Sequence, residues 1–462
     1  MFFKDYKVYE TTLAGRPLKL ETGKMAGLAS AAILARYGET AVLCTVTASA
    51  KPREGVDFFP LSVDYEEKMY SVGRIPGSFQ RREGKAADKA ILAGRCIDRP
   101  IRPLFPKDMR NDCSVVATVM SVDPDCSPEI TAAIGVSAAI AISDIPWDGP
   151  ISSVNVGLVD DEIVINPTLE QREKTELTLT VSSTADLVAM IEAGGNEIPE
   201  DKMFECIMAG HEANKEIVKF INSIVAEIGK PKFEFESNDP DPEILAEIEE
   251  FCVADVEKAL DTDDKKIRDE RLLPIYDAVH EKYDEQFEGQ EGKIEEIMYL
   301  IQKHVVRRWL KDEKKRVDGR GIDEIRPLNA EVDLLPRVHG SGLFTRGQTQ
   351  VLSVATLASL SEAQKLDGLD EEKEKRYIHH YNFPSYSVGE TKPPRGPGRR
   401  EIGHGALAER ALVPVIPSIE DFPYTIRVVS EVLSSNGSTS QGSICTSTLR
   451  ICPTLTTMPT IR

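Results

Sequence analysis

Several common targeting and binding motifs are missing from this chain of 462 residues. The N-terminus has no apolar core of a secretory signal. The longest apolar stretch, Ile130–Ile142, is shorter than the ~20 residues of a membrane span. The eight cysteines form no Cys-x-x-Cys pair and no zinc-binding spacing. We therefore expect a cytoplasmic protein with reduced thiols, no disulfide framework and no membrane among its partners.

Short catalytic motifs are missing as well. The chain has no Gly-x-x-x-x-Gly-Lys-Ser/Thr phosphate loop, no His-Glu-x-x-His motif and no Gly-x-Ser-x-Gly elbow between a strand and a helix. His379 and His380 are adjacent, so in regular structure their side chains point in different directions and are poorly placed to bind one metal. Any chemistry must therefore come from other arrangements.

The charge of the chain is strongly acidic but uneven. The formal net charge is −20. Residues 231–300 carry 23 acidic and 8 basic side chains, whereas residues 74–110 carry 10 basic and 4 acidic ones. The overall charge argues against a nucleic-acid partner, but the basic segment keeps such a partner open.

Four short segments occur twice along the chain in the same order. The members of each pair are separated by 309, 316, 318 and 315 residues. One match alone would mean little, but a nearly constant separation indicates a duplicated domain. The pairs are Gly38–Thr47 with Gly347–Thr356, Tyr70–Gly73 with Tyr386–Gly389, Arg81–Glu83 with Arg399–Glu401, and Leu92–Arg95 with Leu407–Arg410.

Each copy mixes predicted strands and helices. The β-branched runs Thr40–Thr47 and Val351–Thr356 predict strands. The small-residue stretches 128–142 and 438–449 predict buried helices. The mixture predicts an α+β fold class rather than a purely parallel sheet. Further strands are predicted in the first copy at Ser152–Val156, Glu162–Ile165 and Glu176–Val181.

A small helical domain is predicted between the copies. Asp241 and Pro242 are a helix-start signal, and apolar residues recur at spacings of three and four from Ile244 to Leu260. A second helix is predicted at Lys293–Leu310. The acidity of this segment is most simply a solvated face. We predict a first domain at 1–230, an acidic all-α domain at 238–312 and a second domain at 317–462.

The first group of candidate functional residues lies in a basic loop, residues 73–85. Glycine and proline predict the loop conformation. Phe79 could stack on a base, and Arg81 and Arg82 could bind phosphates, a combination typical of proteins that bind single-stranded nucleic acid. The alternative is a solvated basic surface.

Three more arginines follow the basic loop. Arg95, Arg99 and Arg102 are spaced by four and three residues, which places them on one face of a helix. Pro100 limits that helix to its first part. These arginines could extend the nucleic-acid surface, or they could simply be solvated.

A second group, in the second copy, suits an oxyanion. Arg399, Arg400 and His404 lie within six residues, and two guanidinium groups beside a histidine can bind a phosphate. The alternatives are a structural arginine pair and a histidine at an interface.

A third group precedes the small-residue helix of the second copy. Ser438, Thr439 and Ser440 would place hydroxyl and free N–H groups at a helix N-terminus, which favours an anion. The alternative is a simple helix cap without a ligand. Residues 123–127 occupy the matching place in the first copy and are acidic, so we expect only the second copy to bind an anion.

These motifs resemble those of a known family. The two copies are similar to RNase PH domains, and their order around a helical domain resembles the core of the bacterial polynucleotide phosphorylases. The resemblance covers about residues 8–445. Besides the repeated segments, it rests on Arg95–Pro106, Arg316–Arg320, His339–Gln350, His380–Glu390, Arg399–Gly405 and Phe422–Ser440.

The resemblance implies 3′-to-5′ phosphorolysis of RNA in mRNA degradation, catalysed by a polyribonucleotide nucleotidyltransferase. Inorganic phosphate attacks the terminal phosphodiester and releases a nucleoside diphosphate, and the reverse reaction polymerises nucleoside diphosphates. The resemblance also implies a homotrimeric ring whose pore takes single-stranded RNA, with Mg²⁺ at the active site.

The resemblance further implies roles for single residues. Gln80 replaces an aromatic or aliphatic residue common in the family, and Thr439 stands where serine is common. The implied pore-constriction residues are Phe79, Arg81 and Arg82. The residues implied to contact RNA or shape its path are Arg95, Arg99 and Arg102. Those implied to line the active site are Arg399, Arg400 and His404. Those implied to hold the attacking phosphate are Ser438, Thr439 and Ser440.

The resemblance lapses from about Thr446. In the family, the metal-binding carboxylates lie in strands after this point, so we expect no metal ligands within these 462 residues, an incomplete second domain, and little or no activity of this chain alone. One alternative is a non-catalytic RNase PH-like subunit of an RNA-binding ring, which would keep the basic loop. The joint presence of Arg399, Arg400 and His404 with the Ser438–Ser440 group argues against it. Another is a hydrolytic exonuclease, for which no set of four carboxylates is evident.

Overall fold

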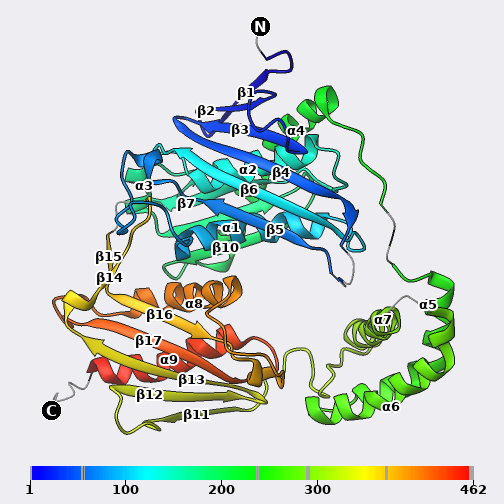
Figure 1. Ribbon diagram of the computed structural model, residues 1–462. Helices are drawn as coiled ribbons and strands as arrows, with labels where there is room; N and C mark the ends of the chain where they lie inside the picture. The colour runs from blue at the N-terminus through cyan, green and yellow to red at the C-terminus, as the bar shows by residue number, and fades with distance from the viewer. Residues whose placement is uncertain are drawn as a thin grey trace. The chain divides into compact units, whose positions relative to one another are not determined.

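The structure is a computed structural model that describes residues 3–53, 56, 58–235, 237, 239–287, 292–369 and 373–456, with side chains up to Leu449 (Figure 1). The chain divides into two compact units. The first unit comprises Met1–Glu236, Leu357–His380 and Gly396–Arg427. The second unit comprises Ser237–Thr356, Tyr381–Arg395 and Val428–Arg462.

The first unit contains a six-stranded sheet. Its strands are β1 (Lys7–Leu13), β2 (Arg16–Thr22), β3 (Ala31–Tyr37), β4 (Thr40–Pro52), β5 (Leu61–Glu66) and β6 (Asn111–Ser121). Their order is β1-β2-β3-β4-β6-β5. β5 runs parallel to β6, and the other neighbours are antiparallel. Along β6, side chains alternate between buried and more exposed positions, as expected for a sheet with one face on the core.

A second sheet completes the first copy. Its strands are β7 (Ser152–Val159), β8 (Glu162–Ile165), β9 (Leu177–Ser183) and β10 (Val188–Gly195), in the order β10-β9-β7-β8. The long helix α4 (Glu200–Ile228) packs on β7 and β9. Gly210 allows this close packing, because a Cβ atom there would lie 2.8 Å from the side chain of Val181.

Helix α2 (Pro128–Ile142) lies between the two sheets and contacts β3 and β4 on one side and β7 on the other. Pro128 suits the first helical position, and Ser127 caps the helix by accepting a hydrogen bond from the N–H of Ile130 at 3.2 Å. Small side chains keep the helix thin. At Gly135 a Cβ atom would lie 2.6 Å from Cys44 Sγ. The prediction of a buried helix at 128–142 is confirmed.

Two helices carry the repeated Leu-Ala-x-Arg segment. α1 (Asp88–Ile101) contains Leu92–Arg95, and α8 (Arg399–Leu412) contains Leu407–Arg410. The two helices pack against each other within the first unit. Equivalent helices of the two copies are therefore neighbours.

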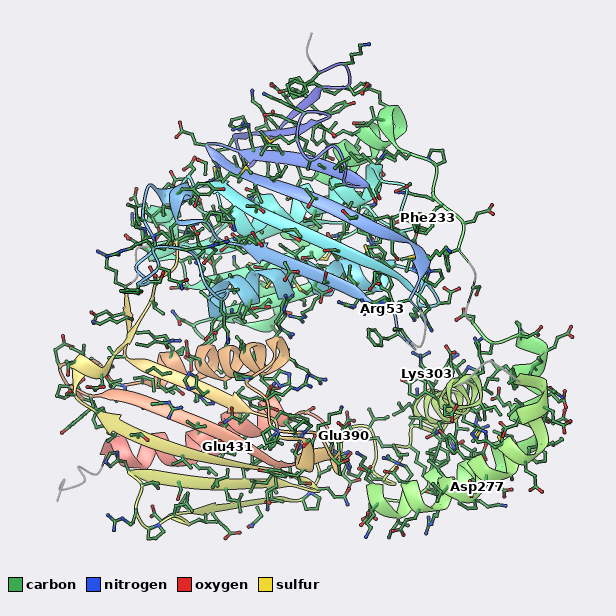
Figure 2. All side chains as sticks on the ribbon, in the orientation of Figure 1. Arg53, Phe233, Asp277, Lys303, Glu390 and Glu431 are labelled. Atoms are coloured by element: carbon green, nitrogen blue, oxygen red, sulfur yellow. The ribbon has the colours of Figure 1, made fainter. Side chains whose placement is uncertain are left out.

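The second copy repeats the sheet-and-helix plan. Its five-stranded sheet consists of β11 (Leu328–Val332), β12 (Gly340–Arg346), β13 (Thr349–Ala358), β16 (Tyr377–Asn382) and β17 (Thr425–Ser434), in the order β11-β12-β13-β17-β16. Helix α9 (Thr439–Thr456) packs on β12. Glu431 lies on β17 (Figure 2). Its carboxylate accepts a hydrogen bond from Asn382 Nδ2 at 2.7 Å. The predicted strand at Val351–Thr356 and helix at 438–449 are confirmed.

The segment between the copies is helical. Its helices are α5 (Pro242–Leu260), α6 (Lys265–Tyr283) and α7 (Lys293–Arg308). They enclose a core that includes Ile248, Val256 and Ile301, and charged residues such as Asp277 lie on the exposed side (Figure 2). The predicted apolar face of α5 is confirmed except at Phe251. That side chain is 44% exposed and lies beneath the Lys282 ammonium group.

Sequence analysis did not identify helix α6. Only three of its side chains, those of Leu272, Val279 and Tyr283, are buried. Pro274 lies inside it, so the usual pattern of apolar residues is weak. The α+β fold class is confirmed, and the exact domain boundaries stay a prediction. In the described part of the chain, every helix is too short or too polar to cross a membrane.

We expect Gly135→Ala to destabilise the first unit by about 1–3 kcal/mol, because the added methyl group overpacks the contact with Cys44 and Ala35. This loss outweighs the gain of about 1 kcal/mol in helix propensity. The measurement is a urea unfolding curve of the full chain in a Trp309→Phe background, in which Trp147 is the remaining tryptophan and reports on the first unit.

Gly27→Ala is the matched control, because a Cβ atom at Gly27 would meet nothing within 4 Å. A Gly135→Ala midpoint equal to or above that of Gly27→Ala would contradict tight packing around α2.

Candidate functional site

The basic loop forms a turn that exposes its aromatic side chain. The N–H of Arg81 donates to Ser78 O at 2.9 Å, and Ser78 Oγ donates to Arg82 O at 2.9 Å. Arg81 adopts a positive φ of 50°. Phe79 is fully exposed, and both arginines are exposed as well. The loop therefore presents an aromatic ring and two guanidinium groups to solvent, an arrangement suited to a single strand of nucleic acid.

The three arginines that follow the basic loop differ in their partners. Arg99 forms an ion pair with Glu192 at 3.2 Å. Arg102 lies just after α1, and two of its nitrogens contact the Asp98 carboxylate at 2.9 and 3.0 Å. Arg95 is half-buried and, among the described residues, forms no hydrogen bond or ion pair. Of the three, Arg95 therefore keeps its charge available for an anionic ligand.

Arg95 lies against the start of α8. A Cβ atom at Gly403 would lie 2.6 Å from Arg95 Nε, so the absence of a side chain there makes room for the guanidinium group. Arg400 and His404 are one turn apart on the same helix. Arg399 instead donates to Val63 O at 2.5 Å and forms an ion pair with Asp64.

The charges around His404 affect its protonation. Burial is the main cause that lowers the pKa of His404 below its usual value, and the positive charges of Arg400 and Arg95 lower it further. Glu401 acts in the opposite direction. The imidazole is therefore mainly neutral at pH 7, and the positive charge of this cluster resides on the two guanidinium groups.

The serine-rich segment forms the N-terminus of α9, and we call Asn436–Ser440 the anion loop. Ser438 is exposed and has a positive φ of 48°, and Ser440 is half-buried. Thr439 is 5% exposed, and its Oγ1 lies 2.6 Å from the hydroxyl of Tyr381. This differs from the expectation that all three hydroxyls face an anion, because the hydroxyl of Thr439 is used inside the protein.

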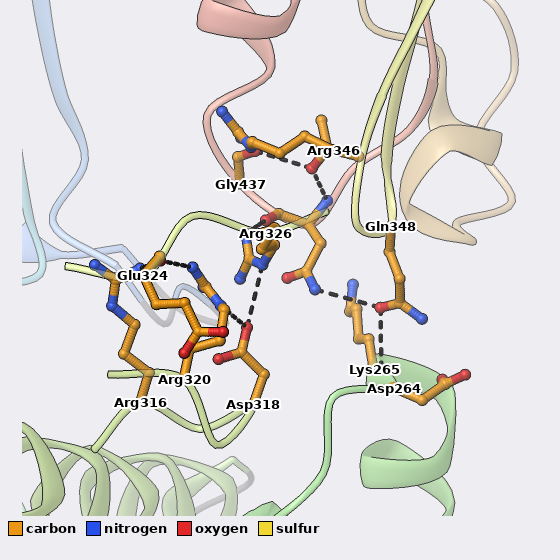
Figure 3. A network of polar contacts seen from close by, with 12 residues as sticks. Asp264, Lys265, Arg316, Asp318, Arg320, Glu324, Arg326, Arg346, Gln348 and Gly437 are labelled. Atoms are coloured by element: carbon orange, nitrogen blue, oxygen red, sulfur yellow. Dashed lines mark hydrogen bonds and ion pairs between the residues drawn. The ribbon is translucent and has the colours of Figure 1, made fainter. Parts of the chain in front are cut away.

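Side chains from β12, from β13 and from the segment before β11 hold the carbonyl groups of the anion loop (Figure 3). Arg326 donates to Asn436 O at 3.2 Å, and Arg346 donates to Gly437 O at 2.9 Å. Thr349 Oγ1 also donates to Gly437 O, at 3.1 Å. With these carbonyls bound, the serine hydroxyls and the first N–H groups of α9 are the polar groups left for an anion.

The equivalent loop of the first copy has a different character. Its Asp123 carboxylate accepts hydrogen bonds from the N–H groups of Asp125 and Glu39. Burial acts to raise the pKa of Asp123, but these hydrogen bonds lower it below its usual value. The loop lies on the wall of a cavity of about 1200 Å³. The Asp123 carboxylate already accepts from the N–H groups of Asp125 and Glu39, so this loop is poorly suited to bind phosphate.

Sequence reasoning assigned no role to several residues of these sites, among them Arg326, Arg346 and Glu192. Arg346 holds the anion loop, and the Glu192 carboxylate pairs with both Arg99 and Arg410. Arg346 precedes Gly347 in the second copy, and Tyr37 precedes Gly38 at the matching place in the first. An alignment of the two repeats would therefore have shown an arginine that is present in the second copy only. No local pattern identifies Glu192, since its partners are distant in sequence.

The expected Mg²⁺ needs oxygen ligands, chiefly carboxylates. Among the described residues, no group of three or more His, Cys, Asp or Glu side chains is arranged to hold a metal ion. The described residues therefore do not fit a magnesium site, and no step is assigned to one.

Three family sequence models match the chain. The model described as the 3′ exoribonuclease family, domain 1, matches residues 14–146 and again residues 324–451, together more than half of the chain. The chain belongs to the 3′ exoribonuclease family. Domain 2 of the family matches residues 149–213. A model described as the RNA-binding domain of polyribonucleotide nucleotidyltransferase matches residues 243–321. The prediction of two RNase PH-type domains around a helical domain is thus confirmed.

Curated members of the exoribonuclease family are closely similar. Polyribonucleotide nucleotidyltransferases of Lachnoclostridium phytofermentans and Ruminiclostridium cellulolyticum are 59% and 56% identical over 448 and 446 residues. Each match covers 96% of this chain, which spans 64% and 63% of the length of these relatives. The solved structure of rice Rrp46 is 16% identical and covers 48% of this chain and 95% of its own, with a TM-score of 0.37.

We expect Arg400→Gln to raise the pKa of His404, because the substitution removes the neighbouring positive charge named above. NMR titration of the imidazole Cε1–H signals measures this pKa. A His404→Gln variant identifies the signal among the seven histidines.

Arg410→Gln, on the same helix, is the matched control and should leave the pKa of His404 unchanged. An unchanged pKa in Arg400→Gln would show that the two side chains do not interact in solution.

Proposed function

We propose that this chain carries the RNA- and phosphate-binding parts of a polyribonucleotide nucleotidyltransferase, a 3′–5′ phosphorolytic exoribonuclease of mRNA degradation. The observation that carries the proposal is the anion loop at the N-terminus of α9, within the second match to the exoribonuclease family. The 56–59% identity to polyribonucleotide nucleotidyltransferases supports the same reaction.

The proposed reaction converts RNA(n+1) and phosphate into RNA(n) and a nucleoside diphosphate. An oxygen of inorganic phosphate forms a bond to the phosphorus of the terminal nucleotide. The bond from that phosphorus to the 3′ oxygen of the preceding nucleotide breaks, and this oxygen takes up a proton. Phosphoryl transfer of this kind depends mainly on alignment and on neutralisation of negative charge.

The contacts described above support the following proposed roles. Ser438 and Ser440 bind the attacking phosphate with the N–H groups of α9, and Thr439 fixes the helix start through Tyr381. Arg400 and Arg95 neutralise phosphate charge, since neither has an ion-pair partner among the described residues. Neutral His404 can donate or accept a hydrogen bond at the reacting group. Arg399 would first have to leave Asp64 to join them.

The proposed RNA path begins at the basic loop, where Phe79 stacks on a base and Arg81 and Arg82 bind backbone phosphates. Arg99 and Arg102 shape the path through their ion pairs rather than by binding RNA directly. We further propose a homotrimeric ring in the cytoplasm with single-stranded RNA in its pore. We propose Mg²⁺ as the cofactor, held by groups outside the described residues.

We expect the full chain to bind inorganic phosphate in isothermal titration calorimetry. Ser438→Ala or Ser440→Ala should weaken this binding at least about tenfold, because a hydrogen bond to a charged group is worth about 1.5–3 kcal/mol. Thr448→Ala is the matched control, since Thr448 is exposed on the same helix and its hydroxyl bonds only to Ile444 O among the described residues.

Nucleotide release from poly(A) with Mg²⁺ identifies the reaction. ADP formed only in the presence of phosphate supports phosphorolysis. AMP formed without phosphate would indicate hydrolysis and contradict the proposal.

We expect Phe79→Ala to weaken poly(A) binding about 5- to 150-fold, because base–aromatic stacking contributes about 1–3 kcal/mol per base. Removing both charges with Arg81→Gln and Arg82→Gln should instead lower the slope of log K against log salt by about 0.7 for each lost phosphate contact. A fluorescence anisotropy titration at several salt concentrations measures both effects.

Leu28→Ala is the control for Phe79→Ala, because Leu28 is an equally exposed apolar side chain of the first unit. Equal affinities of these two variants would show that Phe79 does not stack on RNA.

A further inference from the structure

The conformation of the anion loop depends on groups outside the loop. Its first residue, Asn436, donates its backbone N–H to Thr349 Oγ1 at 3.0 Å. Its side chain donates through Nδ2 to Gln348 Oε1 at 3.3 Å (Figure 3). Asn436 is therefore held at both its backbone and its side chain by the turn that joins β12 to β13.

Gln348 has a second partner, and that partner belongs to the helical segment. The Oε1 atom that accepts from Asn436 also accepts from the backbone N–H of Lys265 at 3.2 Å (Figure 3). One side-chain oxygen thus joins the anion loop to the N-terminus of α6. A carbonyl oxygen has two lone pairs, so both bonds form at once.

The N–H of Lys265 is available because of how α6 begins. The carboxylate of Asp264 caps the helix and accepts from the N–H groups of Lys266 at 2.8 Å and Ile267 at 3.3 Å. The first N–H groups of a helix have no partner inside the helix. The Asp264 carboxylate accepts from the N–H groups of Lys266 and Ile267, so the N–H of Lys265 can donate to Gln348.

We propose that Gln348 is a positioning residue that makes the geometry of the anion loop depend on the helical segment. The inference rests on the proposed function, since the anion loop is taken to bind the attacking phosphate. It adds that single-stranded RNA bound by the helical segment, which matches the family model described as an RNA-binding domain, alters phosphate affinity through Lys265, Gln348 and Asn436. By linkage, phosphate alters the affinity of the helical segment for RNA by the same factor.

The decisive variant is Lys265→Pro. Lys265 is the first residue of α6, where proline fits without loss of an internal helix bond. Asp264 already has the extended backbone that precedes proline, with φ −97° and ψ 117°. The variant therefore removes the N–H that reaches Gln348 and leaves the helix intact. Lys265→Ala removes the same side chain but keeps the N–H, and is the matched control.

A second pair of variants tests the side chain. Gln348→Met removes the shared acceptor and keeps the size of the side chain. Gln350→Met is the matched control, because Gln350 lies next to the same turn and donates to Thr345 rather than to the anion loop. All four variants are studied in the full 462-residue chain, with and without inorganic phosphate.

The first readout is amide hydrogen exchange at residues 437–442, which needs no activity. Loss of one hydrogen bond should speed exchange about two- to tenfold in Lys265→Pro, and at least as much in Gln348→Met. Phosphate affinity should fall by a similar factor in both, with Lys265→Ala and Gln350→Met unchanged. If α6 has only a structural role, Lys265→Pro would speed amide exchange within α6 without changing phosphate affinity.

Equal exchange at 437–442 in Lys265→Pro and Lys265→Ala would overturn the inference. If Lys265→Pro disturbs α6 itself, the amides of residues 266–283 will exchange fast, and Gln348→Met then becomes the deciding variant. Gln348→Met must speed exchange both at Lys265 and at residues 437–442. Faster exchange at only one of these places refutes the coupling. A parent chain that binds no phosphate contradicts the proposed function, while the exchange data still test the link from α6 to the anion loop.

Discussion

A guanidinium group bound to a backbone carbonyl, in the loop before a small-residue helix, is the contact on which both repeats depend. Arg16 binds Asp125 O in the first copy, and Arg326 binds Asn436 O in the second. Each arginine precedes a proline whose carbonyl accepts an N–H from the glycine of the next turn, at 3.0 Å in both copies. Arginine suits this position because its charge is permanent and its donors are planar. In each copy, the arginine thus contacts the loop before the small-residue helix, and the proline after it contacts the turn between two strands.

The two copies use this common frame for different chemistry. In the first copy the Asp123 carboxylate accepts from the N–H of Asp125 in the loop and from the N–H of Glu39 in the turn between β3 and β4, so the protein supplies its own anion. In the second copy Asn436 takes the place of Asp125, and residues 436–440 include no carboxylate. Ser438 is exposed at the helix start, and Ser440 is half-buried. Duplication therefore preserved the hydrogen bonds that shape the loop, while a few substitutions changed which polar groups the loop offers to an anion.

The arginines of the first unit differ in whether a carboxylate lies beside them. Arg99 shares the Glu192 carboxylate with Arg410, and Arg102 pairs with Asp98. Arg95 and Arg400 lack such partners among the described residues and surround the neutral His404. In a chain of net charge −20, two guanidinium groups without an ion-pair partner among the described residues favour an anionic ligand beside them.

The sequence by itself determined the duplication, the α+β class, helices α2, α7 and α9 and the strands β4, β7, β8, β9 and β13, because each depends on a local pattern or on a repeat. The anion-binding residues stay a prediction. The sequence did not reveal α6, whose few buried residues form no stripe. Only the tertiary structure decided that Thr439 bonds to Tyr381, that Glu192 neutralises Arg99, and that Gln348 joins α6 to the anion loop. These contacts join residues 58 to 93 positions apart, and no local spacing encodes which distant groups folding brings within hydrogen-bond distance.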